Sequence, residues 1–294
     1  MAGEVSEPMM TLGTFLERAT SALKEAGLEQ AWREARWLAR EVLGIGEADL
    51  VLRENVLLGP AEKERLRAAL ERRTQREPLA CIAGRTHFLR WQFSIEPGLF
   101  VPRPETEVWV EVAAARLSRM RGGSLVVVDV GCGTGVIGLS LCLLGAASRA
   151  LLVDVSAEAA AMARRNARAL GLESRALVVQ GDLLRAILPR RAHAIVANLP
   201  YVERGAIREL EPEIARWEPP AALDGGEDGL DLIRRLLAQV AAFAEPPRLM
   251  ALEVGAGQAG EVDTLVRGLG RWKALEWVSD YGGIKRAVIA YARD

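Results

Sequence analysis

The chain has 294 residues, of which 50% are hydrophobic and 26% charged, and its formal net charge is −1. This composition is typical of a globular protein with one large or two modest domains, and it excludes a disordered chain. Dedicated binders of duplex nucleic acid usually carry a basic face, so the neutral total argues against that class.

The sequence also lacks the marks of export, membrane insertion and metal binding. It contains no apolar run of 18 residues, and residues 1–10 contain acids where a signal peptide would be apolar. Cys81, Cys132 and Cys142 have neither disulfide-type nor metal-ligand spacing. We therefore expect a cytoplasmic monomer that binds no metal, no membrane and no nucleic acid directly.

The N-terminal quarter has a helical pattern. Between residues 31 and 42 apolar side chains recur at the spacing of one face of an amphipathic helix. Gly27 and Gly44 stand where helices are expected to end, and Pro60 stands at the tolerated first position of another helix. We predict a small helical domain over residues 1–77.

After this domain the pattern changes twice. Residues 85–96 alternate loosely between apolar and polar, which predicts a β-hairpin in a linker over residues 78–98. The remaining residues, 99–294, contain short apolar runs that alternate with helical stretches from residue 125 onward. This alternation predicts an α/β domain with a mostly parallel sheet covered on both faces. The expected strands are 125–129, 150–154, 176–180, 193–197, 248–253, 272–279 and 285–291. The expected helices between them include 136–144, 157–170, 230–243 and 259–269.

A glycine-rich loop, Asp-Val-Gly-Cys-Gly-Thr-Gly at residues 129–135, follows the first expected strand and opens a helix. Glycines let a backbone turn tightly and approach a ligand beside a helix N-terminus. Taken alone, the loop is ambiguous, because Gly133, Gly135 and Gly138 also satisfy the dinucleotide-binding spacing.

Acidic residues at three successive strand ends favour another ligand. Asp129 precedes the first glycine, Asp154 ends the next strand, and Asp182 follows the one after. A sulfonium cofactor derived from methionine suits this acidic rim, since its ribose offers hydroxyl donors and its ammonium and sulfonium are cationic. Asp154 is then expected at the ribose, Asp182 near the adenine amine and Asp129 near the methionine part. Any one of these acids alone could instead be a helix cap or a turn residue.

The tetrapeptide Asn198-Leu199-Pro200-Tyr201 comes directly after a short apolar run. It is therefore expected at the C-terminal end of a buried strand, where open α/β sheets bind ligands. The Asn198 side-chain oxygen and the Leu199 carbonyl are acceptors, Pro200 restrains Leu199 to an extended conformation, and Tyr201 offers a flat face. Together they form a holder for a planar NH₂ group, either an amide or an exocyclic amine.

These residues are similar to the motifs of class I S-adenosylmethionine-dependent methyltransferases that methylate amino groups. Residues 101–107, Val-Pro-Arg-Pro-Glu-Thr-Glu, resemble the PRPxTE segment of the release factor glutamine methyltransferases, the HemK family. The likeness covers nearly the whole chain and includes three further stretches: Glu218-Pro219, Glu253-x-Gly255-x-x-Gln258 and Asp280-x-x-Gly283-x-x-Arg286. One departure is Leu199, where that family usually has proline.

The resemblance implies a seven-stranded, Rossmann-like class I methyltransferase sheet with an N-terminal domain that docks the substrate. It implies methyl transfer from S-adenosyl-L-methionine to the side-chain amide nitrogen of the glutamine in the Gly-Gly-Gln motif of class 1 peptide chain release factors. Catalysis would fall to Asn198, Pro200 and Tyr201, and these residues with Leu199 would bind the glutamine. Cofactor contacts would fall to Phe100, Arg103, Asp129, Gly131, Cys132, Gly133, Thr134, Gly135, Asp154, Asp182, Leu183 and Asn198.

Other functions remain open at this point. The same tetrapeptide could hold the exocyclic amine of adenine, and the form with leucine at its second position occurs in ribosomal RNA adenine dimethyltransferases. A nucleic-acid adenine amino-methyltransferase is therefore the main alternative. A protein that binds the cofactor without catalysis, or a methyltransferase of small-molecule amines, is a further possibility.

Overall fold

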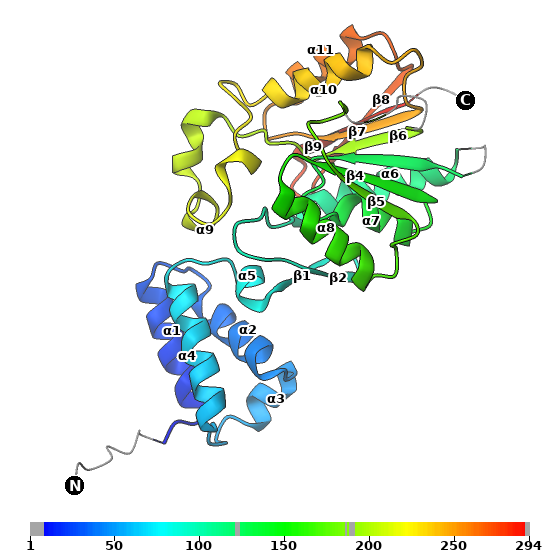
Figure 1. Cartoon of the computed structure of the whole chain (residues 1–294). Helices are drawn as coiled ribbons and strands as arrows, with labels where there is room; N and C mark the ends of the chain where they lie inside the picture. The colour runs from blue at the N-terminus through cyan, green and yellow to red at the C-terminus, as the bar shows by residue number, and fades with distance from the viewer. Residues whose placement is uncertain (1–8, 121–123, 186, 188–191, 292–294) are drawn as a thin grey trace. The chain divides into compact units, whose positions relative to one another are not determined.

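The computed structural model describes residues 9–120, 124–185, 187 and 192–291. The chain divides into two compact units, Met1–Gly84 and Arg85–Asp294 (Figure 1). This division falls inside the linker expected over residues 78–98. The expected limits of 1–77, 78–98 and 99–294 stay a prediction.

The first unit is helical. Its helices are α1 (Leu12–Glu25), α2 (Ala31–Leu43), α3 (Glu47–Leu52), α4 (Pro60–Thr74) and α5 (Leu79–Ala83). Gly44 ends α2 with φ 67°, a left-handed conformation that costs glycine little, and Pro60 begins α4 as expected. Leu23, Leu38 and Leu66 of three helices meet in one buried core. The expected helical character of this part of the chain is confirmed, and it consists of separate helices joined by short connections.

The second unit is built on a seven-stranded sheet with the order β5-β4-β3-β6-β7-β9-β8. Its strands are β3 (Val126–Val130), β4 (Arg149–Asp154), β5 (Ala176–Gln180), β6 (Ala194–Ala197), β7 (Leu249–Glu253), β8 (Ala274–Ser279) and β9 (Lys285–Tyr291). The first five strands are parallel, and β9 runs antiparallel to both of its neighbours. The expected α/β sheet is therefore confirmed.

Helices cover both faces of this sheet (Figure 1). One face carries α6 (Pro104–Ser118), α7 (Val136–Leu143) and α8 (Ala157–Ala169), and the other carries α10 (Asp231–Ala241) and α11 (Ala259–Gly268). Because side chains alternate along a strand, Val127 packs in the core under the first set and Val128 in the core under the second. Both cores are closed to solvent, as a parallel sheet requires.

Helix α6 is not among the elements expected from the sequence. Pro102 precedes its start, and Pro104 occupies the first helical turn, where its missing N–H costs nothing. Buried residues such as Trp109 and Ala113 then anchor the helix on the sheet. The segment Pro-Arg-Pro-Glu-Thr-Glu is therefore a helix N-terminus placed against the sheet.

The expected hairpin is present as β1 (Arg85–Phe88) and β2 (Trp91–Ser94), paired antiparallel. Asn166 of α8 fastens it to the rest of the unit. The Asn166 Oδ1 atom accepts from the Ser94 N–H at 2.7 Å, and its Nδ2 donates to the Ser94 carbonyl at 3.1 Å. The same Nδ2 donates to the Thr134 carbonyl at 2.9 Å, so one buried side chain joins the hairpin to the glycine-rich loop.

Between β6 and α10 the chain forms short helical turns, namely η2 (Arg204–Glu209), α9 (Pro212–Ala215) and η3 (Pro220–Ala222). None of the helices in the described part of the chain is long and apolar enough to span a bilayer. Within the same residues, no three His, Cys, Asp or Glu side chains gather as a metal site would need.

Candidate active site

The two sequence motifs meet at the carboxyl ends of β3 and β6. These strands are parallel neighbours, with Val130 opposite Ala197, so the glycine-rich loop and residues 198–201 leave the sheet side by side. The chain continues from β3 to β4 on one side, whereas β6 lies on the other. Such a change of direction marks the ligand-binding crevice of open α/β sheets.

The glycine-rich loop is held in a conformation that few other residues adopt. Gly131, Gly133 and Gly135 have φ values of 69°, 53° and 84°. The N–H groups of Gly131 and Cys132 donate to the Val153 carbonyl at 2.8 and 3.0 Å, which ties the loop to β4. A Cβ built on Gly133 would have no neighbour within 4 Å, so this part of the loop has an open side.

Leu199 closes the other side of the loop. A Cβ on Gly131 would lie 3.0 Å from Leu199 Cδ2 and 3.8 Å from the Asn198 carbonyl oxygen. Leu199 is buried, so its side chain serves as packing against the glycine loop. The residue that departs from the family pattern therefore has a structural role of its own.

Asp129 is a completely buried acid beneath the loop. Burial raises its pKa to about 7, although its Oδ2 accepts from the Gly138 N–H at 2.8 Å. Its Oδ1 has no hydrogen-bond partner among the described residues. A buried carboxyl oxygen without a partner is costly, and a cationic ligand would offset that cost. The residues present therefore fit the cationic methionine part of a sulfonium cofactor.

Asp154 lies at the end of β4 beside the same loop. Its Oδ2 accepts from the Gly133 N–H at 2.7 Å and its Oδ1 from the Ser156 N–H at 2.9 Å. Burial raises its pKa despite these bonds. Each carboxylate oxygen has a second lone pair, so Asp154 can still accept from the hydroxyls of a ribose.

Asp182 has a more complex environment than the sequence suggests. Both of its carboxylate oxygens accept from Arg235 Nη2, at 2.8 and 2.7 Å. Arg185 Nη1 lies 3.3 Å from Asp182 Oδ2. The next residue, Leu183, is buried with φ 51°, which is rare outside glycine. The adenine contacts expected of this pair stay a prediction, and any such contact shares Asp182 with Arg235.

Cys132 and Thr134 belong to the inner wall of the glycine loop. Burial raises the pKa of the Cys132 thiol well above its usual range, which keeps it protonated and a poor nucleophile. Thr134 is buried, and its carbonyl receives the hydrogen bond from Asn166. Both residues therefore support the shape of the loop.

Phe100 and Arg103 lie together before α6. The Arg103 guanidinium lies 5.0 Å from the centroid of the Phe100 ring, and its Nη2 donates to Glu218 Oε1 at 2.5 Å. Burial raises the pKa of Glu218, and Arg103 opposes that rise. Arg103 thus connects the segment before α6 to the segment that follows the tetrapeptide.

The tetrapeptide rests on a buried hydrogen-bond network that the sequence analysis missed. Asn198 Nδ2 donates to Thr106 Oγ1 at 3.5 Å, and Tyr201 Oη donates to Glu253 Oε1 at 3.4 Å. Gln258 Nε2 donates to the Tyr201 carbonyl at 2.9 Å. The signal that could have revealed the network was an acid, Glu253, that directly follows the apolar residues 249–252 of an expected strand.

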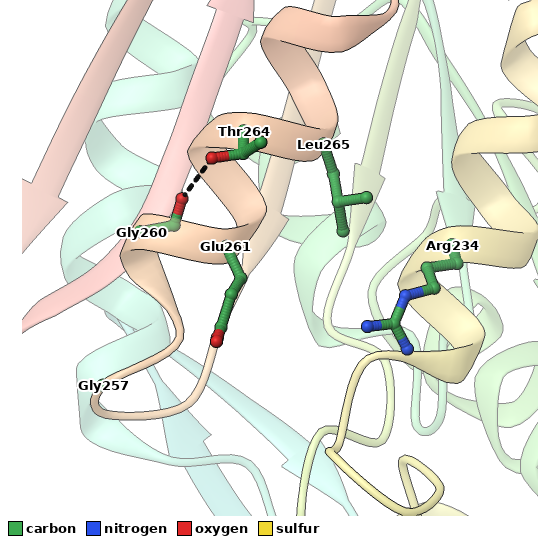
Figure 2. Close-up of a pocket in the computed structure, with 6 residues that line it drawn as sticks. All are labelled: Arg234, Gly257, Gly260, Glu261, Thr264 and Leu265. Atoms are coloured by element: carbon green, nitrogen blue, oxygen red, sulfur yellow. Dashed lines mark hydrogen bonds between the residues drawn. The ribbon is translucent and has the colours of Figure 1, made fainter.

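A separate surface hollow of about 430 Å³ lies between α10 and α11 (Figure 2). It is lined by Arg234, Gly257, Gly260, Glu261, Thr264 and Leu265. Arg234 is paired with Asp228 at 2.5 Å and with Asp231 at 3.4 Å. None of the residues expected at the active site lines this hollow.

Comparison with known proteins agrees with the fold. A family model described as the PrmC N-terminal domain matches residues 14–84, and one described as the methyltransferase small domain matches residues 109–214. The hMettl16 catalytic domain, solved in complex with the MAT2A 3′UTR hairpin 6, shares the fold. Its TM-score is 0.54 at 13% identity, covering 80% of this chain and 83% of that chain.

Curated relatives are similar over nearly the full length. The release factor glutamine methyltransferase of Rhodospirillum rubrum is 39% identical over 99% of this chain and 88% of that protein. That of Moorella thermoacetica is 36% identical over 97% of this chain and 100% of that protein. The 4-amino-L-phenylalanine/4-methylamino-L-phenylalanine methyltransferase of Streptomyces pristinaespiralis is 36% identical, covering 89% of each. The family models and these relatives together show that the chain is a methyltransferase and belongs to the release factor glutamine methyltransferase family.

Proposed function

We propose that this enzyme methylates the side-chain amide nitrogen of the glutamine in the Gly-Gly-Gln motif of class 1 peptide chain release factors. The observation that carries the proposal is the contact of Leu199 with Gly131, which sets the NH₂-holding tetrapeptide directly beside the glycine loop. The full-length likeness to enzymes named for release factor glutamine supports the choice of substrate.

The methyl donor in this proposal is S-adenosyl-L-methionine. Asp129 would hold its methionine part and Asp154 its ribose. The backbone of residues 131–135 would lie along the cofactor, and Asp182 with Leu183 would lie at the adenine. The unpartnered Asp129 Oδ1 supports a cationic ligand at this place. When bound, the cofactor supplies an electrophilic methyl group.

The residues of this chain would act by holding the amide. An amide nitrogen is a weak nucleophile, because its lone pair is delocalised into the carbonyl. Asn198 Oδ1 and the Leu199 carbonyl accept from the NH₂ group and turn the nitrogen toward the cofactor side of the site. As positive charge develops on the nitrogen, these hydrogen bonds strengthen, which stabilises the transition state selectively. The Tyr201 ring forms the flat wall against which the amide lies.

We further propose that the N-terminal domain docks the release factor and that the enzyme works as a cytoplasmic monomer without direct contact to nucleic acid. The match of residues 14–84 to the PrmC N-terminal domain supports a dedicated role for this domain. Removing it should raise KM for the release factor and leave methylation of a short Gly-Gly-Gln peptide unchanged.

The decisive experiment is mass analysis of the tryptic Gly-Gly-Gln peptide after incubation of a release factor with the enzyme and S-adenosyl-L-methionine. The glutamine is expected to gain one methyl group, and a release factor with Gln→Glu at this position is expected to gain none. An RNA substrate in a parallel reaction tests the adenine alternative.

A second candidate activity has a specific observation in its favour. The Streptomyces pristinaespiralis relative, which is named for 4-amino-L-phenylalanine, is about as similar to this chain as one of the release factor enzymes. An arylamine also presents a planar NH₂ group to the tetrapeptide. Methylation of 4-amino-L-phenylalanine but not of the release factor would reverse the assignment.

A further inference from the structure

One buried carboxyl group connects helix α6 to the tetrapeptide. Glu253, the last residue of β7, is almost fully enclosed, and its Oε2 accepts from Thr106 Oγ1 at 2.6 Å and from Trp109 Nε1 at 2.7 Å. Thr106 and Trp109 are three positions apart on α6 and therefore face the sheet together. The other oxygen, Oε1, accepts from Tyr201 Oη at 3.4 Å.

The direction of these hydrogen bonds has a consequence for Asn198. A threonine hydroxyl has one hydrogen to donate, and Thr106 donates it to Glu253. Toward Asn198 the Thr106 oxygen therefore offers only lone pairs, which suit the Nδ2 group that lies 3.5 Å away. An Asn198 amide turned by half a rotation would place Oδ1 against these lone pairs and lose the bond.

We propose that Thr106 and Glu253 are positioning residues that fix the orientation of the Asn198 amide, with Nδ2 toward α6 and Oδ1 toward the substrate. This inference rests on the proposed function, in which Asn198 Oδ1 accepts from the substrate NH₂ group. Asn198 Oδ1 has no hydrogen bond to any described residue, so it is free for that role. Through Oε1, the same Glu253 holds Tyr201 and so supports both ends of the tetrapeptide.

Three matched variants test this chain of hydrogen bonds from Glu253 through Thr106 to Asn198, here called the relay. Thr106→Val keeps the branched shape but removes the hydroxyl, Thr106→Ser keeps the hydroxyl, and Trp109→Phe removes the other donor to the same oxygen. Thr106→Val should lower kcat about tenfold or more, with cofactor affinity by calorimetry and KM for the release factor little changed. Thr106→Ser should restore kcat to within about threefold of the wild type. Trp109→Phe should lower kcat less than Thr106→Val does.

A double-mutant cycle separates positioning from a general loss of structure. If Thr106 acts through Asn198, then Thr106→Val should add almost nothing to the loss caused by Asn198→Ala. Losses that multiply in the double variant would overturn the proposal, as would a wild-type kcat in Thr106→Val. A wild-type enzyme that methylates no release factor would instead refute the proposed function, and the relay is then decided without turnover.

That independent readout is the side-chain amide resonance of Asn198, assigned by its absence in Asn198→Asp. The resonance should move in Thr106→Val and return in Thr106→Ser, because only the hydroxyl receives the Nδ2 hydrogen. A resonance that is the same in Thr106→Val and the wild type means that Asn198 is oriented by something else.

Discussion

The Leu199 side chain lies directly against Gly131, and a Cβ added to that glycine would come within 3.0 Å of Leu199 Cδ2. The contact joins the loop expected to hold the methyl donor to the loop expected to hold the acceptor. Any change that widens the spacing between these loops should therefore affect turnover before it affects folding.

Gly131→Ala tests this spacing. The variant introduces a left-handed alanine, which costs roughly 1–2 kcal/mol of folding free energy, and it also pushes Leu199 away. Gly145→Ala is the matched control, since Gly145 has φ 74° but an added Cβ would meet nothing within 4 Å. Gly145→Ala should show only the cost of the left-handed alanine in urea unfolding, and Gly131→Ala should lose at least as much stability, but only Gly131→Ala should lose methyl transfer, by about tenfold or more. Equal activity in the two variants would show that the contact is unimportant.

Asn198→Ala should lower kcat by about 10²–10³-fold, the usual cost of losing one hydrogen-bonding group that acts in the transition state. Cofactor affinity measured by calorimetry should stay near that of the wild type. Single-turnover methylation of the release factor measures the chemical step directly. A variant that retains near-normal turnover rules out Asn198 Oδ1 as an acceptor for the substrate.

If Asp129 holds the cationic part of the cofactor as proposed, cofactor binding should depend on pH. Its pKa of about 7 means that it is mostly protonated at pH 6 in the cofactor-free protein. A cationic ligand favours the ionised form, so binding should release a proton at pH 6 and almost none at pH 8.5. Affinity should rise with pH and level off above about 7. Calorimetry in buffers of different ionisation enthalpy counts the protons released, and Asp129→Asn should release fewer.

The same group makes the stability of the cofactor-free protein depend on pH. Because its folded pKa lies above the ordinary value of 3.8, its contribution to stability is fully present below that value and is lost as pH rises through about 7. Asn at this position cannot ionise. The stability of Asp129→Asn relative to the wild type should therefore rise as pH increases from about 4 to about 7 and stay constant above that. A difference in the free energy of urea unfolding between Asp129→Asn and the wild type that is the same at every pH would contradict this account.

Removing Arg103 alone from the ion pair of Arg103 and Glu218 should lower the free energy of unfolding more than replacing both residues. Glu218 is almost fully buried and its Oε2 has no partner among the described residues, so removing Arg103 strands a carboxyl group. Arg103→Met should lower the free energy of unfolding by about 2–4 kcal/mol, allowing for the partial exposure of Arg103. The double variant Arg103→Met, Glu218→Gln should recover a large part of that loss in urea unfolding. No recovery would mean that Arg103 acts through packing on Phe100.

Local pattern was sufficient to predict what depends on neighbours in sequence. The strand positions follow from short apolar runs, and the glycine loop follows from the left-handed conformations that only glycine adopts readily. Contacts between distant residues were out of reach. Thr106 and Glu253 are separated by 147 positions and Asp182 and Arg235 by 53, and no periodicity connects them.

Helix α6 shows a different kind of failure. No helix was predicted over residues 104–118, although proline in the first helical turn, where Pro104 lies, is compatible with a helix. The motif was therefore recognised by its letters while its structural role, to bring Thr106 beneath the tetrapeptide, was not. The two motifs do follow the strands that the sequence predicted for them, and only the fold showed which distant residues support them.

The triple hydrogen bond of Asn166 decides where this enzyme can be cut. A fragment that begins at residue 85 keeps strand β2, and Asn166 stays satisfied by Ser94 and Thr134. A fragment that begins at residue 99 discards the hairpin and leaves the buried Asn166 amide without two of its three hydrogen bonds, next to the glycine-rich loop. The glycine-rich loop should therefore be less ordered in the shorter fragment. A truncated form of this enzyme should begin before the hairpin.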